Sequence, residues 1–175
     1  MLRHEVEKRD HNNEPCTFRK PRCLTGTYFE LKGGEMVQIE RLKNVEIFQG
    51  LKDEELRIAA RFWQEEGVPE GVTLCEEGAR ADKLFILEEG AVSIRFKKGV
   101  NYAIRAPGRI LGWSFLVPPN RYTASAVTIA PSRLLVIKSP DFYDLVHKET
   151  KMGIKIMDNL AQVVSSRLKA FVDYY

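Results

Sequence analysis

The chain has few cysteines, few histidines and little net charge, and each shortage excludes a class of protein. Its 175 residues include three cysteines and three histidines, and the formal net charge is +3. Cys16, Cys23 and Cys75 are odd in number and lack C-x-x-C spacing, so they indicate reduced thiols in a cytoplasm rather than a disulfide framework. The N-terminus is charged, unlike a secretory signal, and no stretch approaches the roughly 18 apolar residues of a membrane helix. We therefore expect a cytoplasmic protein with no membrane association.

The charge pattern also argues against nucleic-acid binding. No run of lysine and arginine approaches what binding by charge alone requires. The sequence stops at Tyr175, with no room for a helix-turn-helix after the last predicted helix. We therefore expect no direct DNA binding.

Patterns of catalysis and metal binding are equally scarce. Residues 71–137 contain no histidine, which argues against the histidine-ligated metal of cupin-type barrels. Ser114 in Gly-Trp-Ser-Phe-Leu lacks the second glycine of a nucleophile elbow and has no histidine in its domain to activate it. Cys75 fits a small core residue in a strand, and His147 fits a structural residue on a helix. The sequence therefore predicts no catalytic residue, no metal and a non-enzymatic protein.

Residues 1–34 differ from the rest of the chain. They mix charges of both signs with two prolines and have no apolar period, which predicts a flexible or peripheral extension. Cys16 and Cys23, with His4 and His11 nearby, match no common zinc-ligand spacing. Two further parts follow, a domain at residues 35–149 and a final helix at residues 150–175.

The domain opens with helices. A hydrophobic content of 44% is enough for one domain with a core. The first helical spacing consists of Met36, Ile39, Leu42 and Val45. A second helix begins at the acidic run Asp53-Glu54-Glu55, which favours a helix N-terminus. Its apolar stripe consists of Leu56, Ala59, Ala60 and Trp63, and ends near Gly67. Trp63 is predicted to pack in the core rather than stack on a ligand.

Short strands dominate residues 71–137. Some segments alternate apolar and polar residues, whereas 84–87 and 134–137 are fully apolar. The strand segments are residues 72–74, 84–87, 92–96, 102–104, 123–129 and 134–137. Short strands separated by glycine and proline indicate a barrel or jelly roll.

Two helices are predicted after the strands. Ser139 is expected to cap the first, with Pro140 in its first turn. Its buried stripe is Phe142, Leu145 and Val146. The last helix has two apolar flanks. One alternates spacings of four and three, as in a coiled coil: Met157, Ala161, Val164, Leu168, Phe171 and Tyr175. The other is Ile156, Leu160 and Val163. We favour a homodimer through the first flank and packing on the roll through the second, over a helix that only covers its own roll.

Residues 108–126 have the pattern of an anion-binding turn. A strand-like start runs into Gly112, followed by a short hydrophobic turn, a proline-rich break and Arg121 before the next strand. Glycine lets backbone N–H groups converge on a phosphate, and a nearby arginine complements its charge.

The order of these segments resembles the cyclic nucleotide-binding domain family, found in catabolite-activator-like regulators, protein kinase regulatory subunits and gated channels. The matching segments are residues 77–78, 82–94, 108–126 and 133–142. The resemblance covers residues 45–175 and implies a mainly β fold with flanking helices, the double-stranded β-helix or jelly roll known as the β-roll. It also implies a long C-terminal helix that dimerises in the bacterial regulators.

The phosphate-binding cassette departs from the family pattern. The family's ribose-binding glutamate is replaced by Trp113, a small residue is replaced by Phe115, and Tyr122 stands where the phosphate arginine is expected. Arg121 lies one residue earlier, and a slip of one residue along a strand turns a side chain to the opposite face. Under the resemblance, the ligand-binding candidates are Gly112, Trp113, Ser114, Phe115, Leu116, Arg121, Tyr122, Thr123 and Ala124.

The resemblance implies a ligand-sensing regulatory module that binds cyclic AMP weakly or not at all. A different anionic ligand, such as another phosphorylated small molecule, is one alternative. The other is a degenerate domain whose pocket is filled by Trp113, Phe115 and Tyr122 and which acts in protein–protein interaction. In the family, ligand capture repositions the helix after the roll, so we expect a hinge at residues 147–153, where Gly153 interrupts the helical pattern.

Overall fold

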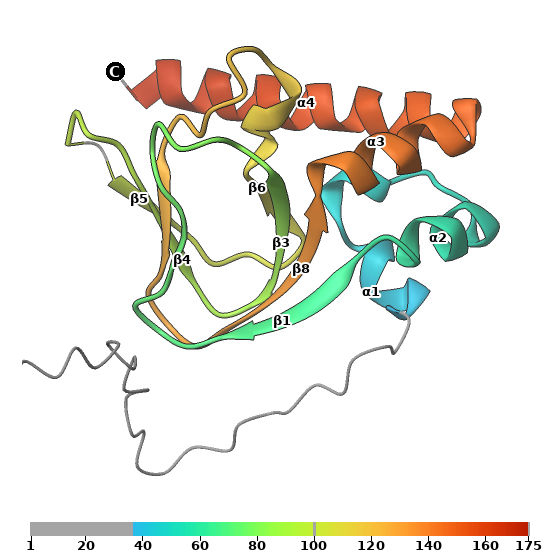
Figure 1. Cartoon of the computed structure of the whole chain (residues 1–175), viewed down its shortest axis with the longest axis horizontal. Helices are drawn as coiled ribbons and strands as arrows, with labels where there is room; N and C mark the ends of the chain where they lie inside the picture. The colour runs from blue at the N-terminus through green and yellow to red at the C-terminus, as the bar shows by residue number, and fades with distance from the viewer. Residues whose placement is uncertain (1–36, 100, 175) are drawn as a thin grey trace, which may run out of the picture.

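Two four-stranded antiparallel sheets face each other and form a roll (Figure 1). The computed structural model describes residues 37–99 and 101–174. One sheet has the strand order β1-β8-β3-β6 and the other β2-β7-β4-β5. The strands are β1 (Gln64–Val68), β2 (Thr73–Cys75), β3 (Lys83–Glu89), β4 (Val92–Arg95), β5 (Asn101–Ile104), β6 (Arg109–Leu111), β7 (Ser125–Thr128) and β8 (Ser132–Lys138). The expected roll of short strands is confirmed.

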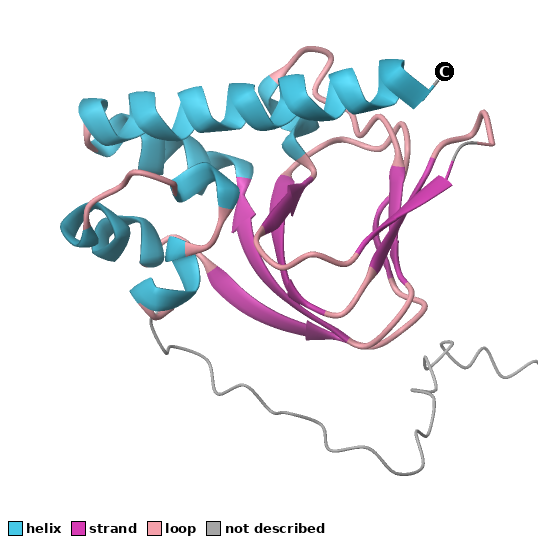
Figure 2. Ribbon diagram, turned by 180° about the vertical axis from the view of Figure 1, so that it is seen from behind, coloured by secondary structure: helices cyan, strands magenta, loops and turns pink. Residues whose placement is uncertain are grey.

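Helices gather on one side of the roll, and the longest runs along its edge (Figures 1 and 2). The helices are α1 (Ile39–Lys43), α2 (Asp53–Ala60), α3 (Ser139–Lys148) and α4 (Thr150–Tyr174), with short 3-10 helices η1 (Glu46–Phe48) and η2 (Trp113–Leu116). α4 contacts η1 and α3. The expected flanking helices and long C-terminal helix are therefore confirmed.

The two fully apolar strand segments form the centre of a sheet that is buried on both faces. In β3, Leu84 and Ile86 pack against the helices, whereas Phe85 and Leu87 point into the roll. β8 alternates in the same way and pairs with β3. Burial on both faces removes the apolar–polar alternation of a half-exposed strand, which explains the unbroken apolar runs.

The predicted end of the second helix is wrong. α2 ends at Ala60, and Gln64–Val68 forms β1, which pairs only with β8 at the edge of its sheet. Charged residues on an edge strand hide its period and protect the edge from further pairing. Trp63, as predicted, is a core residue and packs edge-on against Phe48.

Two predictions about the last helices need correction. Ser139 is the first residue of α3 rather than its cap, since the cap position is Lys138 and no side chain caps it. Gly153 does not interrupt the helical stretch, because it lies inside α4. The break is at Glu149, whose backbone is extended and which falls within the predicted hinge range of residues 147–153. A Cβ at Gly153 would lie 1.9 Å from the Val146 carbonyl oxygen. This glycine therefore permits close packing of α4 on α3 rather than a break in the helix.

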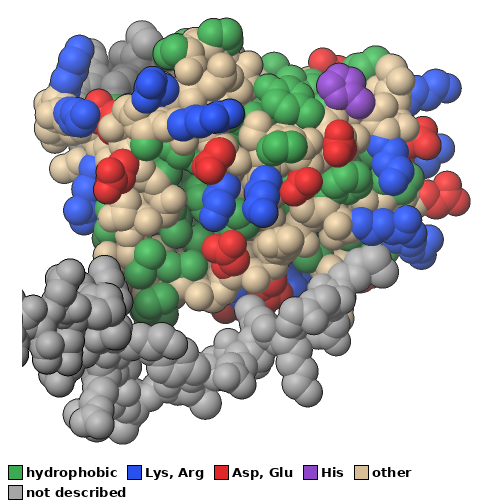
Figure 3. Space-filling model, in the orientation of Figure 1, with side chains coloured by type: hydrophobic (Ala, Val, Ile, Leu, Met, Phe, Trp, Pro, Cys, Tyr) green, Lys and Arg blue, Asp and Glu red, His purple; other side chains and the backbone are tan. Residues whose placement is uncertain are grey.

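Three further predictions concern the N-terminal extension, membrane-spanning helices and surface charge. The predicted extension at residues 1–34 and its Cys16 and Cys23 lie outside the described residues. In the part that is described, no helix combines the length and apolarity needed to cross a membrane. On the face shown in Figure 3, side chains of opposite charge are interspersed.

Candidate functional site

The turn after β6 is built around a glycine that satisfies two constraints. Gly112 has φ of 90°, in the left-handed region. A Cβ there would also lie 2.7 Å from the Lys83 carbonyl oxygen. Only glycine meets both constraints without strain. Gly112 therefore allows the sharp turn from which η2 starts. η2 then separates two hollows, one inside the roll and one outside it.

The roll cavity has a volume of about 80 Å³. Its lining is largely apolar and aromatic, and includes Phe96, Tyr102, Trp113 and Tyr122. Among the described residues that line it, Arg167 is the one with a formal charge. A cavity of this size lies below the roughly 300–1,000 Å³ typical of small-molecule sites.

Tyr122 fills the position expected for a phosphate-binding arginine. Its side chain is buried. The hydroxyl accepts a hydrogen bond from the Lys83 backbone N–H at 3.0 Å and donates to the Lys83 carbonyl at 3.1 Å. Burial raises the pKa of Tyr122 to about 12, so the ring stays neutral. Tyr122 therefore joins β3 to the segment before β7 rather than offering a charge to the cavity.

Trp113 contacts a cation that comes from α4. The guanidinium of Arg167 lies over the indole ring, 4.7 Å from its centroid. The same group donates to the Ile110 carbonyl oxygen at 2.5 Å and forms an ion pair with Glu46. Burial lowers the pKa of Arg167, while the Glu46 carboxylate acts in the opposite direction. Arg167 thus attaches α4 to both the cassette and η1.

Glu46 organises this contact from the other side. Its carboxylate accepts the Ile110 backbone N–H at 3.1 Å and pairs with Arg109 at 3.0 Å. Arg167 therefore binds a carboxylate that β6 and η1 already hold in place. Such a fixed acceptor lowers the entropic cost of ordering a long side chain.

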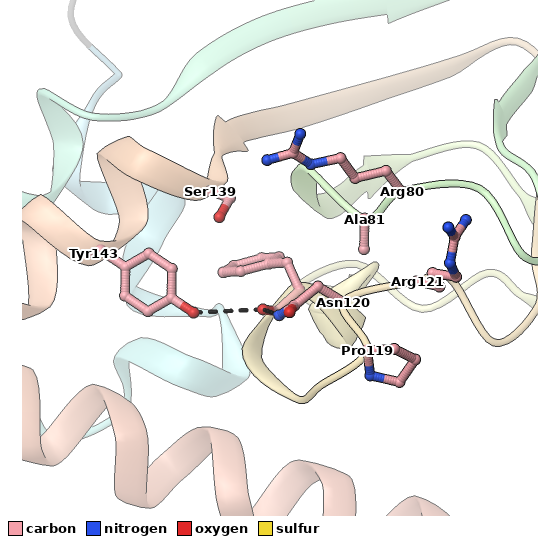
Figure 4. A pocket seen from close by; sticks show the side chains of 8 residues that line it. Arg80, Ala81, Pro119, Asn120, Arg121, Ser139 and Tyr143 are labelled. Atoms are coloured by element: carbon pink, nitrogen blue, oxygen red, sulfur yellow. Dashed lines mark hydrogen bonds between the residues drawn. The ribbon is translucent and has the colours of Figure 1, made fainter.

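Arg121 lies on the outside of the roll and does not line its cavity. It forms an isolated bridge with Arg80, and its Nη1 donates to the Gly78 carbonyl at 2.7 Å. Both arginines line an outer pocket of about 370 Å³ (Figure 4). Ser139 and Tyr143, at the start of α3, line the same pocket.

The ligand-binding candidates therefore fall into two groups. The roll cavity is lined by Gly112, Trp113, Ser114, Tyr122, Thr123 and Ala124. The outer pocket is lined by Phe115 and Arg121. Leu116 lines neither pocket and packs against the helical core. Arg121 and Tyr122, although adjacent in the sequence, thus belong to different pockets: Tyr122 lines the roll cavity and Arg121 the outer pocket.

Sequence reasoning missed Arg167, Glu46 and Arg80. Arg167 lies on the predicted last helix but belongs to no apolar flank, and Glu46 precedes two buried residues of η1. Only the folded chain brings them together, because Glu46 and Arg167 are 121 positions apart. Phe96 and Tyr102, which also line the roll cavity, did have a signal in the sequence, because both lie in predicted strand segments.

The predicted coiled-coil flank of α4 is exposed over most of its described length. Met157 and Leu168 have exposed fractions of 40% and 65%, and Ala161 is exposed. Val164 is half-buried against the helical core. Tyr175 and the side chain of Phe171 lie outside the described part. The other flank, Ile156, Leu160 and Val163, is buried against the domain.

The chemistry of catalysis and metal binding is sparse at this site. Within residues 37–99 and 101–174, no group of three or more His, Cys, Asp or Glu side chains could hold a metal ion. Cys75 lines the roll cavity, but burial raises the pKa of its thiol to about 11. A thiol that stays protonated is a weak nucleophile.

The chain is similar to known cyclic nucleotide-binding proteins. The family model of the cyclic nucleotide-binding domain matches residues 65–149. A solved structure from Geobacter metallireducens GS-15, assigned to the cyclic nucleotide-binding proteins, is 32% identical with a TM-score of 0.66. That similarity covers 76% of this chain and 99% of the other.

Two curated relatives match shorter parts of their own length. The Cyclic AMP receptor protein of Thermus thermophilus is 25% identical over 133 residues, which is 73% of this chain and 59% of that protein. Glutaminase 2 of Bradyrhizobium diazoefficiens is 31% identical over 100 residues, which is 57% of this chain and 16% of that protein. The chain thus spans less than two thirds of either relative.

Proposed function

Since the chain belongs to the cyclic nucleotide-binding domain family, we propose that it is a non-enzymatic, ligand-sensing regulatory module that does not bind cyclic AMP tightly. The observation on which this rests is the contact between Trp113 and Arg167. Both side chains line the roll cavity, and their contact joins the cassette to α4. A ligand that enters the cavity must compete with this contact, and the competition would change how α4 is held.

The altered cassette supports weak binding of cyclic AMP. Trp113 stands where the family has a ribose-binding carboxylate, and Tyr122 stands where it has a phosphate-binding arginine. The described lining includes no Asp or Glu. Hydrogen bonds to charged groups contribute about 1.5–3 kcal/mol each, so losing two such partners weakens binding by at least about a hundredfold.

The non-enzymatic part of the proposal is supported by the chemistry of the lining. The roll cavity has a thiol, Cys75, whose pKa is raised to about 11. No histidine lies among the described residues that line the roll cavity or the outer pocket. The similarity to Glutaminase 2 covers 16% of that protein, so its name is no argument for catalysis by this domain.

The module acts as a homodimer through α4. Ile154, with an exposed fraction of 56%, extends the predicted seam by one step toward the N-terminus. The described seam is then Ile154, Met157, Ala161, Val164 and Leu168, with alternating spacings of three and four. This pattern is complementary to a second copy of itself, which is what a two-fold coiled-coil contact requires.

A second candidate function is a protein-interaction module that needs no small molecule. The small volume of the roll cavity, about 80 Å³, favours it. Trp113 and Tyr122 line this cavity, whereas Phe115, which was also predicted to fill it, lines the outer pocket instead. In this case α4 would be fixed permanently by Arg167 rather than released by a ligand.

Calorimetry after a thermal-shift screen separates the two functions. The screen uses cyclic AMP, cyclic GMP, cyclic dinucleotides and other phosphorylated metabolites. A ligand at about 100 times its Kd stabilises the fold by about 2.7 kcal/mol, which is readily seen. We expect a Kd for cyclic AMP weaker than micromolar, and a tighter value would contradict the proposal.

The variants Arg167→Gln and Lys169→Gln test the role of α4. A roll ligand identified in the screen should bind Arg167→Gln with altered affinity, because it no longer competes with the guanidinium. Lys169 is exposed on the same helix, so its replacement should leave affinity unchanged. If no compound binds in the roll cavity of the wild-type chain, the interaction module is favoured.

A further inference from the structure

The outer pocket is a second hollow that shares no lining residue with the roll cavity. It is lined by Arg80, Asn120, Arg121, Ser139 and Tyr143, together with apolar residues. Its volume of about 370 Å³ falls within the roughly 300–1,000 Å³ typical of small-molecule sites. Figure 4 shows Ser139 and Tyr143 on one side and Arg121 on the other.

Arg80 and Arg121 lie opposite one another in the backbone, and neither has a counter-charge among the described residues. Arg80 and Arg121 are partners in an antiparallel bridge, and like charges directly opposite one another are destabilising. Among the described residues, neither has a carboxylate within ion-pair distance, and the described lining includes no Asp or Glu. The backbone holds the pair in place, because Ala81 donates to the Asn120 carbonyl and Tyr122 donates to the Ala79 carbonyl.

We propose that this outer pocket binds a small molecule that bears a phosphate group, and that Arg80 and Arg121 bind the phosphate. A guanidinium donates two parallel hydrogen bonds to a phosphate, and two guanidiniums balance the charge of a phosphate monoester dianion. The Ser139 hydroxyl is a further hydrogen-bond donor in the pocket, and the N-terminus of α3 adds positive potential there. The size of the pocket favours a small molecule over a protein segment.

The offset in the cassette gives this site its arginine. Tyr122 points inward to Lys83, and its neighbour Arg121 points outward. The replacement of the inner arginine by tyrosine is therefore accompanied by an arginine on the other side of η2. Anion binding outside the roll does not depend on any ligand inside it.

The test is a titration of the full chain with glycerol 3-phosphate, in which binding is measured by NMR from the amide chemical shifts. We expect saturable shifts at residues 79–82, 120–121, 139 and 141–143, with a Kd at or below about 1 mM. The double variant Arg80→Gln/Arg121→Gln should weaken binding by about tenfold or more. Arg57 and Arg105 are exposed elsewhere, so Arg57→Gln/Arg105→Gln removes the same charge and should leave the Kd unchanged.

Four results would overturn the proposal. They are equal weakening in both double variants, no saturation below about 10 mM, shifts centred on residues 111–114 and 122–126 of the roll, and a phosphoserine peptide that binds more than about tenfold tighter than glycerol 3-phosphate. If the double variant fails to fold, Arg80→Gln and Arg121→Gln are measured singly, and each should weaken binding. A failure of cyclic AMP, cyclic GMP and the cyclic dinucleotides to bind leaves this titration unaffected, since the two pockets share no described lining residue.

Discussion

The guanidinium of Arg167 lies 4.7 Å from the centre of the Trp113 ring, and this contact joins the C-terminal helix to the turn that follows β6. Arg167 also binds Glu46 and the Ile110 carbonyl. The three partners come from different parts of the chain, so this one side chain holds α4, η1 and β6 together.

Replacing Arg167 with alanine is expected to lower the free energy of unfolding by about 2 kcal/mol. The loss combines a partly desolvated cation–π contact with hydrogen bonds to a carboxylate and a carbonyl. Glu46 keeps Arg109 and the Ile110 N–H as partners, which limits the effect. Denaturant unfolding measures it as a lower midpoint.

Lys169→Ala is the control, because Lys169 is exposed two residues further along α4. We expect a change within about 0.5 kcal/mol for this surface variant. Equal midpoints for the two variants would mean that the Arg167 contacts do not stabilise the fold.

Gly153→Ala should destabilise the protein even though alanine is the better helix former by about 1 kcal/mol. The new Cβ would lie 1.9 Å from the Val146 carbonyl oxygen and 2.8 Å from its carbon. α3 and α4 must move apart to relieve this clash, which costs about 1–3 kcal/mol in a packed interface. Thermal unfolding measures the change.

Gly67→Ala is the matched control, since a Cβ there meets nothing within 4 Å. Its melting temperature should stay close to that of the wild type. A Gly153→Ala variant as stable as Gly67→Ala would show that the two helices are not closely packed at Val146.

The sequence predicted the roll and its family but not how the cassette is closed. Unbroken apolar runs such as residues 84–87 mark a sheet buried on both faces, and turn residues separate the strands, so local patterns are sufficient for the fold. β1 was missed because it has no apolar period. Its charged residues form ion pairs instead, such as that between Glu65 and Arg41. The Arg167 contact has no local pattern, since it depends on how α4 crosses the roll.

Gly153 illustrates a second limit of the sequence. A glycine in a helical pattern indicates either a break or a close approach. The spacing of apolar residues is the same in both cases. Only the position of α3 relative to α4 decides between them, and it favours the close approach.

Tyr122→Phe should lower stability at neutral pH and change the response to alkali. At neutral pH the variant loses the hydroxyl that bonds the Lys83 N–H and carbonyl, which costs about 1–3 kcal/mol. In the wild type, burial raises the pKa of Tyr122 from 10.0 to about 12. The folded state therefore holds its proton after the unfolded state has lost it, so the contribution is complete below pH 10 and falls between pH 10 and pH 12.

Unfolding midpoints measured from pH 8 to pH 12 test the Tyr122 contribution. The fall above pH 10 should be shallower in Tyr122→Phe than in the wild type. Tyr143→Phe is the control, because Tyr143 has an exposed fraction of 39%, and it should keep the wild-type slope. The same slope in all three proteins would contradict a tyrosine pKa raised by burial.

The double variant Met157→Glu/Leu168→Glu is expected to convert a dimer into a monomer. Both side chains are exposed on the proposed seam of α4, together with Ile154. In a two-fold contact each new carboxylate would be buried near its own copy, where like charges repel and desolvation is unfavourable. Analytical ultracentrifugation should show at least about a tenfold weaker self-association. Gln162→Glu introduces a charge on an exposed position away from this seam and should leave the dimer intact. A wild-type chain that sediments as a monomer, or a Gln162→Glu variant that dissociates as readily as the seam variant, would mean that α4 does not pair through this face.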